Sequence, residues 1–274
     1  MTQRLKIAGL CIIIVCLIIG WLELVRSVGS FIPQSETVKQ SSAPGEEIGS
    51  PQVALVLDDF GYNTQNVERI FRLHAPVTFS ILPNLPYSAE VAGRVAENGH
   101  ECLLHLPLEP HADTPETYEE MPLEDQTIHS RMGRAQILQI TRRAIAGVPG
   151  ALGVSNHMGS KATEDPYVMG VIFDVLKGRD MLFLDSLVTG SSICGQLAAE
   201  KGIRFAKRDV FLDAQQDRAF IEGKIDRLIQ IAKEQGYAVG IGHDRTQTIE
   251  VLEDMIDEFK QHGIELVHIS HLAQ

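Results

Sequence analysis

Two adjacent carboxylates, Asp58 and Asp59, directly follow the apolar run VALVL at residues 53–57. Two like charges at the end of a buried strand repel each other and lose hydration. A cation between them offsets both penalties, because it favours the ionised form of each carboxylate. The pair therefore predicts a bound metal ion at this position.

Histidine and aspartate also end several of the other predicted strands. His105 ends the third, Asn156 and His157 end the fourth, Asp185 ends the fifth and His243 ends the seventh. In barrels and open α/β sheets the carboxyl ends of parallel strands meet at one rim, where catalytic residues gather. Aspartate is common there as a helix N-cap but histidine is not, so three histidines favour a functional site.

One aspartate and two histidines form a ligand set for Zn²⁺ or a similar divalent ion, with positions left open for water. We expect Asp59, His105 and His157 to be these ligands. Such an ion lowers the pKa of bound water to about 7. Asp58 would then be the general base that takes the proton of that water, and His243 could protonate the leaving group as general acid.

The elements that position these residues alternate from Val53 onward. Short β-branched runs predict strands at 53–57, 77–82, 101–105, 151–155, 181–185, 203–207, 237–242 and 264–269. Amphipathic segments predict helices at 66–73, 88–98, 128–146, 165–178, 192–202, 219–236 and 249–263. This alternation predicts a parallel sheet covered by helices.

Eight predicted strands favour an α/β fold of the (β/α) barrel type, either closed or incomplete and distorted. A doubly wound open sheet is the alternative, but it would need a glycine-rich phosphate loop after its first strand. The first strand ends instead in LDDFGYN, which holds a single glycine. Residues 109–127, rich in acids and prolines, form an unusually long predicted loop, and such loops commonly shape an active site.

The N-terminal residues 1–26 predict a membrane anchor or uncleaved signal. The apolar run at 7–25 follows Arg4 and Lys6 and can just cross a bilayer of about 30 Å. The basic residues favour a cytoplasmic N-terminus. We therefore expect inner-membrane anchoring, with the domain on the periplasmic or extracytoplasmic side. A cleaved signal peptide is the alternative and would give a secreted form, although VRSVGS is a poor cleavage site.

Composition sets further bounds. Residues 27–50, rich in Ser, Gly, Pro and Glu, predict a flexible linker, which leaves 51–274 for the folded domain. The formal charge of −12 argues against a nucleic-acid partner. The only cysteines outside the apolar run are Cys102 and Cys194, and we interpret both as small buried hydrophobic residues.

The motifs VLDDFG, NGHECLLH, NHMGS, LFLDS and GIGHD, in this order, resemble the polysaccharide deacetylase superfamily, most closely its divergent branch. The similarity covers about residues 52–271. It implies a metal-dependent hydrolase that removes acetyl groups from a carbohydrate or cell-envelope glycan. It also implies Asp58 as general base, Asp59 and His105 as metal ligands, and His243 as leaving-group acid, with Asp185 tuning that histidine.

Two departures from the parent family leave alternatives open. Where the family has a second histidine, four residues after the first, this chain has Glu109, and NHMGS replaces an Arg-Pro-aromatic motif. His157 could supply the missing imidazole from the next strand, and we prefer this because imidazole suits Zn²⁺. Glu109 could instead be the third ligand, with His157 binding substrate. The candidate substrate-binding residues are Glu109, Asn156, Arg208 and Asp209; Arg208 could bind a substrate anion or pair with Asp209.

Two other functions compete with deacetylation. The departures favour a non-catalytic carbohydrate-binding or envelope-organising protein that keeps the fold. The retained base and acid oppose it, because a binding protein needs neither. A phosphatase with an aspartate nucleophile is weaker still, since such enzymes usually space their two acids by one residue. Membrane and carbohydrate are the expected partners, and the sequence does not indicate whether the protein has protein partners.

Overall fold

The structure is a computed structural model and describes residues 49–112 and 126–274. The predicted membrane anchor, nearly all of the predicted linker and most of the long loop at 109–127 lie outside these residues. Within the described ranges, no helix is long and apolar enough to cross a membrane.

The described residues form one nine-stranded sheet in which every pairing is parallel. The strands are β1 (Gln52–Phe60), β2 (Thr78–Ile81), β3 (Glu101–Leu108), β4 (Gly153–Met158), β5 (Leu182–Asp185), β6 (Phe205–Lys207), β7 (Val210–Phe211), β8 (Tyr237–His243) and β9 (Glu265–Val267). Their order is β6-β5-β4-β3-β2-β1-β8-β7, and β9 also pairs with β1. The eight predicted strands are all present, and the two-residue β7 is an addition.

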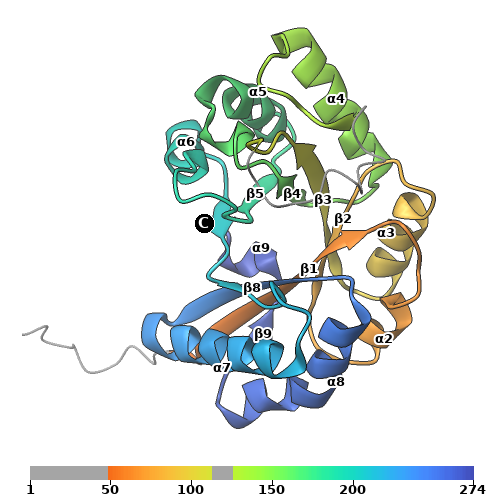
Figure 1. Ribbon diagram of the computed structural model, residues 1–274, viewed down its shortest axis with the longest axis vertical. Helices are drawn as coiled ribbons and strands as arrows, with labels where there is room; N and C mark the ends of the chain where they lie inside the picture. Colours follow the sequence, from red (N-terminus) through yellow and green to blue (C-terminus); the bar gives the residue numbers. More distant parts are fainter. Residues whose placement is uncertain (1–48, 113–125) are drawn as a thin grey trace, which may run out of the picture. The chain divides into compact units, whose positions relative to one another are not determined.

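The sheet curves into a distorted (β/α) barrel with one open seam (Figure 1). β6 and β7 lie at the two ends of the strand order and form no ladder with each other in the described chain. Only Arg208 and Asp209 connect them. The backbone N–H of Arg208 donates to the Asp185 carbonyl, and that of Asp209 donates to the Val239 carbonyl, so this dipeptide bridges β5 and β8 across the seam. The predicted incomplete barrel is therefore found.

Helices surround the sheet, and α9 lies near the centre of the ring (Figure 1). They are α2 (Val67–Phe71), α3 (Ser88–Glu97), α4 (Arg134–Gly147), the 3₁₀ turn η3 (Ala162–Glu164), α5 (Pro166–Lys177), α6 (Cys194–Lys201), α7 (Arg218–Gln235), α8 (Thr246–Gln261) and α9 (Ile269–Leu272). α4 begins six residues later than predicted, because Ile128 forms a β-bridge with Leu108. Asp165 caps α5 by accepting from Tyr167 and Val168.

Both faces of the sheet are buried, which explains why its strands are almost continuously apolar. Along β1, Val53, Leu55 and Leu57 pack in the cluster that contains the helices' apolar side chains, whereas Ala54 and Val56 face the barrel interior. Ile269 and Leu272 of α9 belong to the interior cluster. The C-terminal helix thus packs inside the barrel at the amino ends of β2 and β3, where Ile269 donates to Thr78 and Ser270 donates to Glu101.

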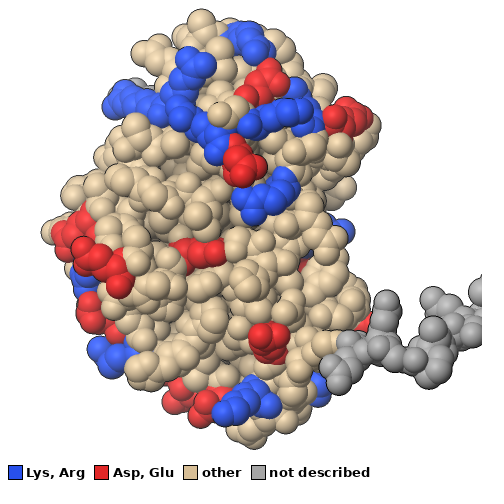
Figure 2. Space-filling view, turned by 180° about the vertical axis from the view of Figure 1, so that it is seen from behind, with Lys and Arg blue, Asp and Glu red and all other residues tan. Residues whose placement is uncertain are grey.

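The surface carries its charges unevenly. In Figure 2, Lys and Arg gather over the upper end of the molecule, where α4 and α5 lie in Figure 1. Asp174 of α5 pairs with Arg134 of α4 and with Lys201 at the end of α6. These ion pairs connect the three helices, although exposed pairs of this kind contribute little stability.

Cys102 and Cys194 are free and buried, as predicted. Burial raises the pKa of the Cys102 thiol to about 11 and that of Cys194 to about 12. Both thiols therefore stay protonated and behave as apolar side chains.

Candidate active site

Strand alternation aims three polar side chains at the barrel interior. Successive side chains of a strand point to opposite faces. Asp58 follows Ala54 and Val56, which are interior residues of β1. By the same spacing His105 follows Leu103 on β3, and His243 follows Val239 and Ile241 on β8. Each of these three polar residues therefore occupies the next inward-facing position after the apolar interior residues of its strand.

Asp59 reaches the same site by a break in the strand. Alternation would turn Asp59 away from Asp58, but its backbone has φ 71°, in the left-handed region. The register between β1 and β2 shifts between Leu57 and Phe60 at this point. This local irregularity lets two adjacent carboxylates face one cavity.

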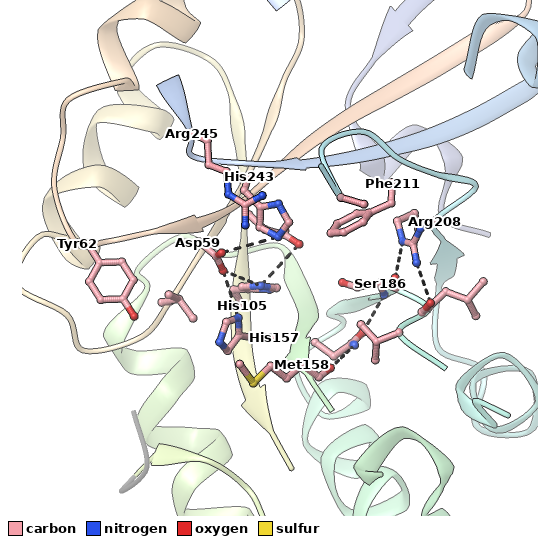
Figure 3. Close-up of a pocket in the computed structure, with 16 residues that line it drawn as sticks. Asp59, Tyr62, His105, His157, Met158, Ser186, Arg208, Phe211, His243 and Arg245 are labelled. Atoms are coloured by element: carbon pink, nitrogen blue, oxygen red, sulfur yellow. Dashed lines mark hydrogen bonds and ion pairs between the residues drawn. The ribbon is translucent and has the colours of Figure 1, made fainter. Parts of the chain in front are cut away.

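Asp59, His105 and His157 form a compact cluster (Figure 3). The Oδ1 atom of Asp59 lies 3.2 Å from His157 Nδ1 and 3.4 Å from His105 Nε2. Each residue offers one ligand atom, and these atoms all lie within 4.8 Å of one another. Ser155 Oγ lies 2.8 Å from His105 Nδ1, which orients the Nε2 atom of His105 toward Asp59.

Two observations support a divalent cation at this cluster. Ligands that share an ion at bonds of 2.0–2.2 Å lie about 3 to 3.6 Å apart, which matches the two distances from Asp59. In addition, Asp58 Oδ1 and Asp59 Oδ1 are buried and have no hydrogen-bond partner among the described residues. Buried carboxylate oxygens are ordinarily paired, so a cation is the partner that this arrangement lacks.

Asp58, the predicted general base, lies beside this cluster. Its side chain is buried, and its Oδ2 atom lies 3.6 Å from His105 Nε2. Burial raises its pKa, and the nearby His105 and His243 offset only part of this effect. Burial acts in the same direction on Asp59, but the close imidazoles of His105 and His157 outweigh it and hold the pKa of Asp59 well below its usual value.

His243 is held by a buried aspartate. Its Nδ1 atom lies 2.8 Å from Asp213 Oδ1, and its backbone N–H donates to Asp213 Oδ2. Thr248 donates a further hydrogen bond to the same oxygen. Burial lowers the pKa of His243, but the hydrogen bond with Asp213 and the charges of the surrounding carboxylates raise it overall. The Nε2 atom points to the cluster of Asp59, His105 and His157 and lies 3.8 Å from Asp59 Oδ2.

These residues line one cavity of about 890 Å³. Its lining includes both predicted catalytic residues Asp58 and His243, together with the three predicted ligands. Tyr62, Phe211 and Arg245 also line it and were not predicted (Figure 3). A cavity of this size can take a sugar and its substituents.

Asp185 does not tune His243, so the role implied by the family resemblance is corrected. Asp185 shares the face of Phe183, which packs toward the helices rather than the interior. Its carboxylate accepts from the backbone N–H of Leu187 and from the hydroxyl of Ser192. The aspartate that holds His243 is Asp213.

The structure also places the predicted substrate-binding residues. Glu109 lies away from the cavity, because its carboxylate accepts from the backbone and hydroxyl of Ser130 and from Lys161. Glu109 therefore does not belong to the cluster of Asp59, His105 and His157. Asp209 is likewise outside the cavity lining, and its side chain accepts from the N–H of Val239.

Asn156 and Arg208 do line the cavity. Both polar ends of the Asn156 amide are used within the protein, since Nδ2 donates to the Met158 carbonyl and Oδ1 accepts from Ser186. Arg208 donates to the carbonyls of Ser186 and Leu187 and forms no ion pair with Asp209 within the described residues.

Comparison with known proteins agrees with this architecture. A family model described as divergent polysaccharide deacetylase matches residues 55–273. The uncharacterized protein YibQ of Escherichia coli K12 is 34% identical over 205 residues, which cover 75% of this chain and 62% of YibQ. The chain thus spans less than two thirds of the length of that relative.

A second relative and one solved structure extend the comparison. An uncharacterized protein of Haemophilus influenzae Rd is 32% identical over 221 residues, covering 81% of this chain and 76% of that protein. The crystal structure of an uncharacterized protein of Agrobacterium tumefaciens C58 has a TM-score of 0.76 at 24% identity, covers 84% of this chain and 92% of that chain, and supports the fold. The chain belongs to the divergent polysaccharide deacetylase family.

Proposed function

We propose that this protein is a metal-dependent hydrolase that removes acetyl groups from a carbohydrate. One observation carries the proposal: a three-residue ligand group, a buried base and a supported histidine face the same cavity. Membership of the deacetylase family points to the same substrate class.

Asp59, His105 and His157 are the residues that would hold the ion. When bound, a divalent ion there supplies positive charge that lowers the pKa of water and polarises the acetyl carbonyl. Two imidazoles and one carboxylate suit Zn²⁺, which we propose as the metal.

Asp58 takes a proton from the attacking water. Its pKa is raised by burial, which makes it a stronger base than an exposed carboxylate. Because its Oδ1 atom has no other partner within the described residues, that oxygen is available for the proton.

His243 supplies the proton that the leaving group needs. Its Nδ1–H is held by Asp213, so the proton to be transferred is on Nε2. The raised pKa keeps this imidazole protonated in a larger fraction of molecules at neutral pH.

The bonds balance for an N-acetyl group. The water oxygen forms a bond to the carbonyl carbon, and Asp58 receives the water proton. The carbon–nitrogen bond then breaks, and His243 gives its Nε2 proton to the nitrogen. The products are a free amine on the sugar and acetic acid, which loses its remaining water proton at neutral pH and becomes acetate. Asp58 then releases its proton and His243 takes one up, which restores the site. For an O-acetyl group the same steps release a hydroxyl.

Acetate release tests the proposal. The full-length chain, stripped with a chelator and reloaded with Zn²⁺, is incubated with a panel of N- and O-acetylated oligosaccharides. We expect acetate only from the reloaded protein, no acetate from Asp58→Ala, and unchanged release from Asp226→Ala, an exposed position on α7. Fully loaded wild-type protein that releases no acetate from any substrate would contradict the proposal, and glycan binding without hydrolysis would favour a binding protein.

We also propose that residues 7–25 anchor the domain outside the inner membrane, where envelope glycans are accessible. The support is the apolar sequence alone, since these residues lie outside the described part of the chain. Recovery of the protein in the membrane fraction, with the domain digested by protease added to spheroplasts, is the expected result. Digestion only after lysis would contradict it.

A further inference from the structure

Arg208 is fixed at the cavity wall by neutral groups. Its Nε atom donates to the Ser186 carbonyl at 2.6 Å, and Nη2 donates to the Leu187 carbonyl at 2.8 Å. The guanidinium also lies over the ring of Phe211, with Cζ 4.8 Å from the ring centroid (Figure 3). Two carbonyls and one aromatic face therefore hold its plane in a single orientation.

The turn that presents these carbonyls is itself held in place. The N–H of Ser186 donates to Asn156 Oδ1, and the N–H of Leu187 donates to Asp185 Oδ1, each at 2.8 Å. Leu187 has φ 49°, a left-handed conformation that such contacts must stabilise. Asn156 and Asp185 thus act as positioning residues for Arg208.

The charge of Arg208 has no close counter-ion. No described carboxylate lies within 4.0 Å of its guanidinium, and its Nη1 donors make no hydrogen bond to the described residues. The group is partly buried. A guanidinium does not lose its proton in proteins, so a desolvated positive charge with free donors faces the cavity.

The other charges of the cavity do not supply the missing anion. A divalent ion at Asp59, His105 and His157 offsets the two carboxylates of β1. Asp213 is used by His243 and lies 3.9 Å from Arg245, a second cation in the lining. With the ion bound, the charged side chains that line the cavity are therefore net positive, although the chain as a whole carries a formal charge of −12. Asp185 and Asp209, which do not line the cavity, attract the charge of Arg208 only at longer range.

We propose that Arg208 binds an oxyanion of the substrate, so that the substrate is an acidic glycan. The inference rests on the proposed function, which places the acetyl group at His243. The Phe211 ring lies 5.1 Å from the His243 ring and also contacts Arg208. An anionic substituent at Arg208 is thus separated from the reacting group by one aromatic ring, against which a sugar can pack.

A matched pair of probes tests this inference. The first is a tetrasaccharide of alternating N-acetylglucosamine and glucuronic acid, and the second is the same compound with its carboxyl groups methyl-esterified. Binding of each to the Zn²⁺-loaded full-length chain is measured by calorimetry, and acetate release is followed in parallel. The variants are Arg208→Gln, Arg208→Lys and, as control, Arg227→Gln, an exposed arginine on α7 that donates to Gln230.

The wild type should bind the acid about 10- to 100-fold more tightly than the ester, the range of a charge-assisted hydrogen-bond pair. Arg208→Gln should abolish this ratio by weakening only the acid, Arg208→Lys should retain part of it, and Arg227→Gln should leave it unchanged. Because the wild-type ratio needs no variant, the test stands even if Arg208→Gln does not fold.

Equal binding of acid and ester by the wild type, no binding of the acid, or an unchanged ratio in folded Arg208→Gln would overturn the inference. The failure of the proposed function looks different. In that case the wild type binds the free carboxylate probe more tightly than the ester but releases no acetate. Acetate release without this preference would contradict only the role of Arg208.

Discussion

Asp58 and Asp59 are neighbours in the chain, yet both carboxylates lie beside one nitrogen: Asp58 Oδ2 is 3.6 Å and Asp59 Oδ1 is 3.4 Å from His105 Nε2. The left-handed backbone of Asp59 makes this possible. The two acids then differ in environment, because burial raises the pKa of Asp58 while the histidines hold that of Asp59 low. Opposite pKa shifts of two carboxylates in one site are typical of different roles, in agreement with the proposed roles of base for Asp58 and metal ligand for Asp59.

Asp58→Asn should remove the base and leave the ligands. We expect acetate release to fall by about 10²- to 10⁴-fold, the usual contribution of a general base, with metal content unchanged. Loss of metal from this variant would assign Asp58 to the ligand set instead. Metal analysis and acetate release on the same preparation check both points.

The same variant should stabilise the metal-free protein at neutral pH. The folded-state pKa of Asp58 lies above its usual value of 3.8, so ionisation costs folding free energy above that pH and costs nothing below it. Thermal unfolding should give Asp58→Asn a higher Tm than the wild type at pH 7, with the difference vanishing below about pH 3.8. A lower Tm at pH 7 would show that ionised Asp58 stabilises the fold.

Asp213→Asn should lower the pKa of His243, because it removes the hydrogen bond and charge that raise it. A general acid must be protonated, so the alkaline limb of the kcat profile should move to lower pH, with kcat at alkaline pH reduced by about 10- to 100-fold. Asp185→Asn is the matched control and should leave that limb in place. A shift with Asp185→Asn and none with Asp213→Asn would reverse the assignment.

Glu109 should stabilise the fold rather than serve the site. Burial raises its pKa, but hydrogen bonds from Ser130 and Lys161 outweigh this and lower it to about 2. Its contribution is complete above its usual value of 4.5 and is lost as the pH falls toward about 2. Glu109→Gln should therefore reduce the free energy of unfolding at pH 7 by about 1–2 kcal/mol in urea titrations. The difference should shrink below pH 4.5, with kcat unchanged. If the wild type and Glu109→Gln differed by the same free energy of unfolding at pH 7 and well below pH 4.5, the stabilisation would not come from the ionised carboxylate.

Strand periodicity accounts for what the sequence could predict. Asp58, His105 and His243 lie two or four residues beyond interior residues of their strands, so their inward orientation follows from alternation. The same rule places Asp185 with Phe183 on the outer face, which position at a strand end alone did not distinguish.

The role of Asp213 was harder to predict than its place on the rim of the site, because β7 is only two residues long and carries no detectable period. Asp213 lies two residues beyond Phe211, whose side chain packs on the interior cluster, and this spacing indicates that Asp213 also points inward. The backbone irregularity at Asp59 and the contacts of Glu109 with Ser130 and Lys161 depend on segments far apart in the sequence. Local patterns do not contain that information.

Metal content distinguishes His157 from Glu109 as the third metal ligand. Metal content is measured by mass spectrometry on the full-length wild type and on His157→Ala, Glu109→Ala and His262→Ala, each reloaded with Zn²⁺ and dialysed. His262, at the exposed end of α8, is the matched histidine control.

We predict about one ion per chain in the wild type, Glu109→Ala and His262→Ala, and little or none in His157→Ala. Full metal in His157→Ala together with loss from Glu109→Ala would contradict the account.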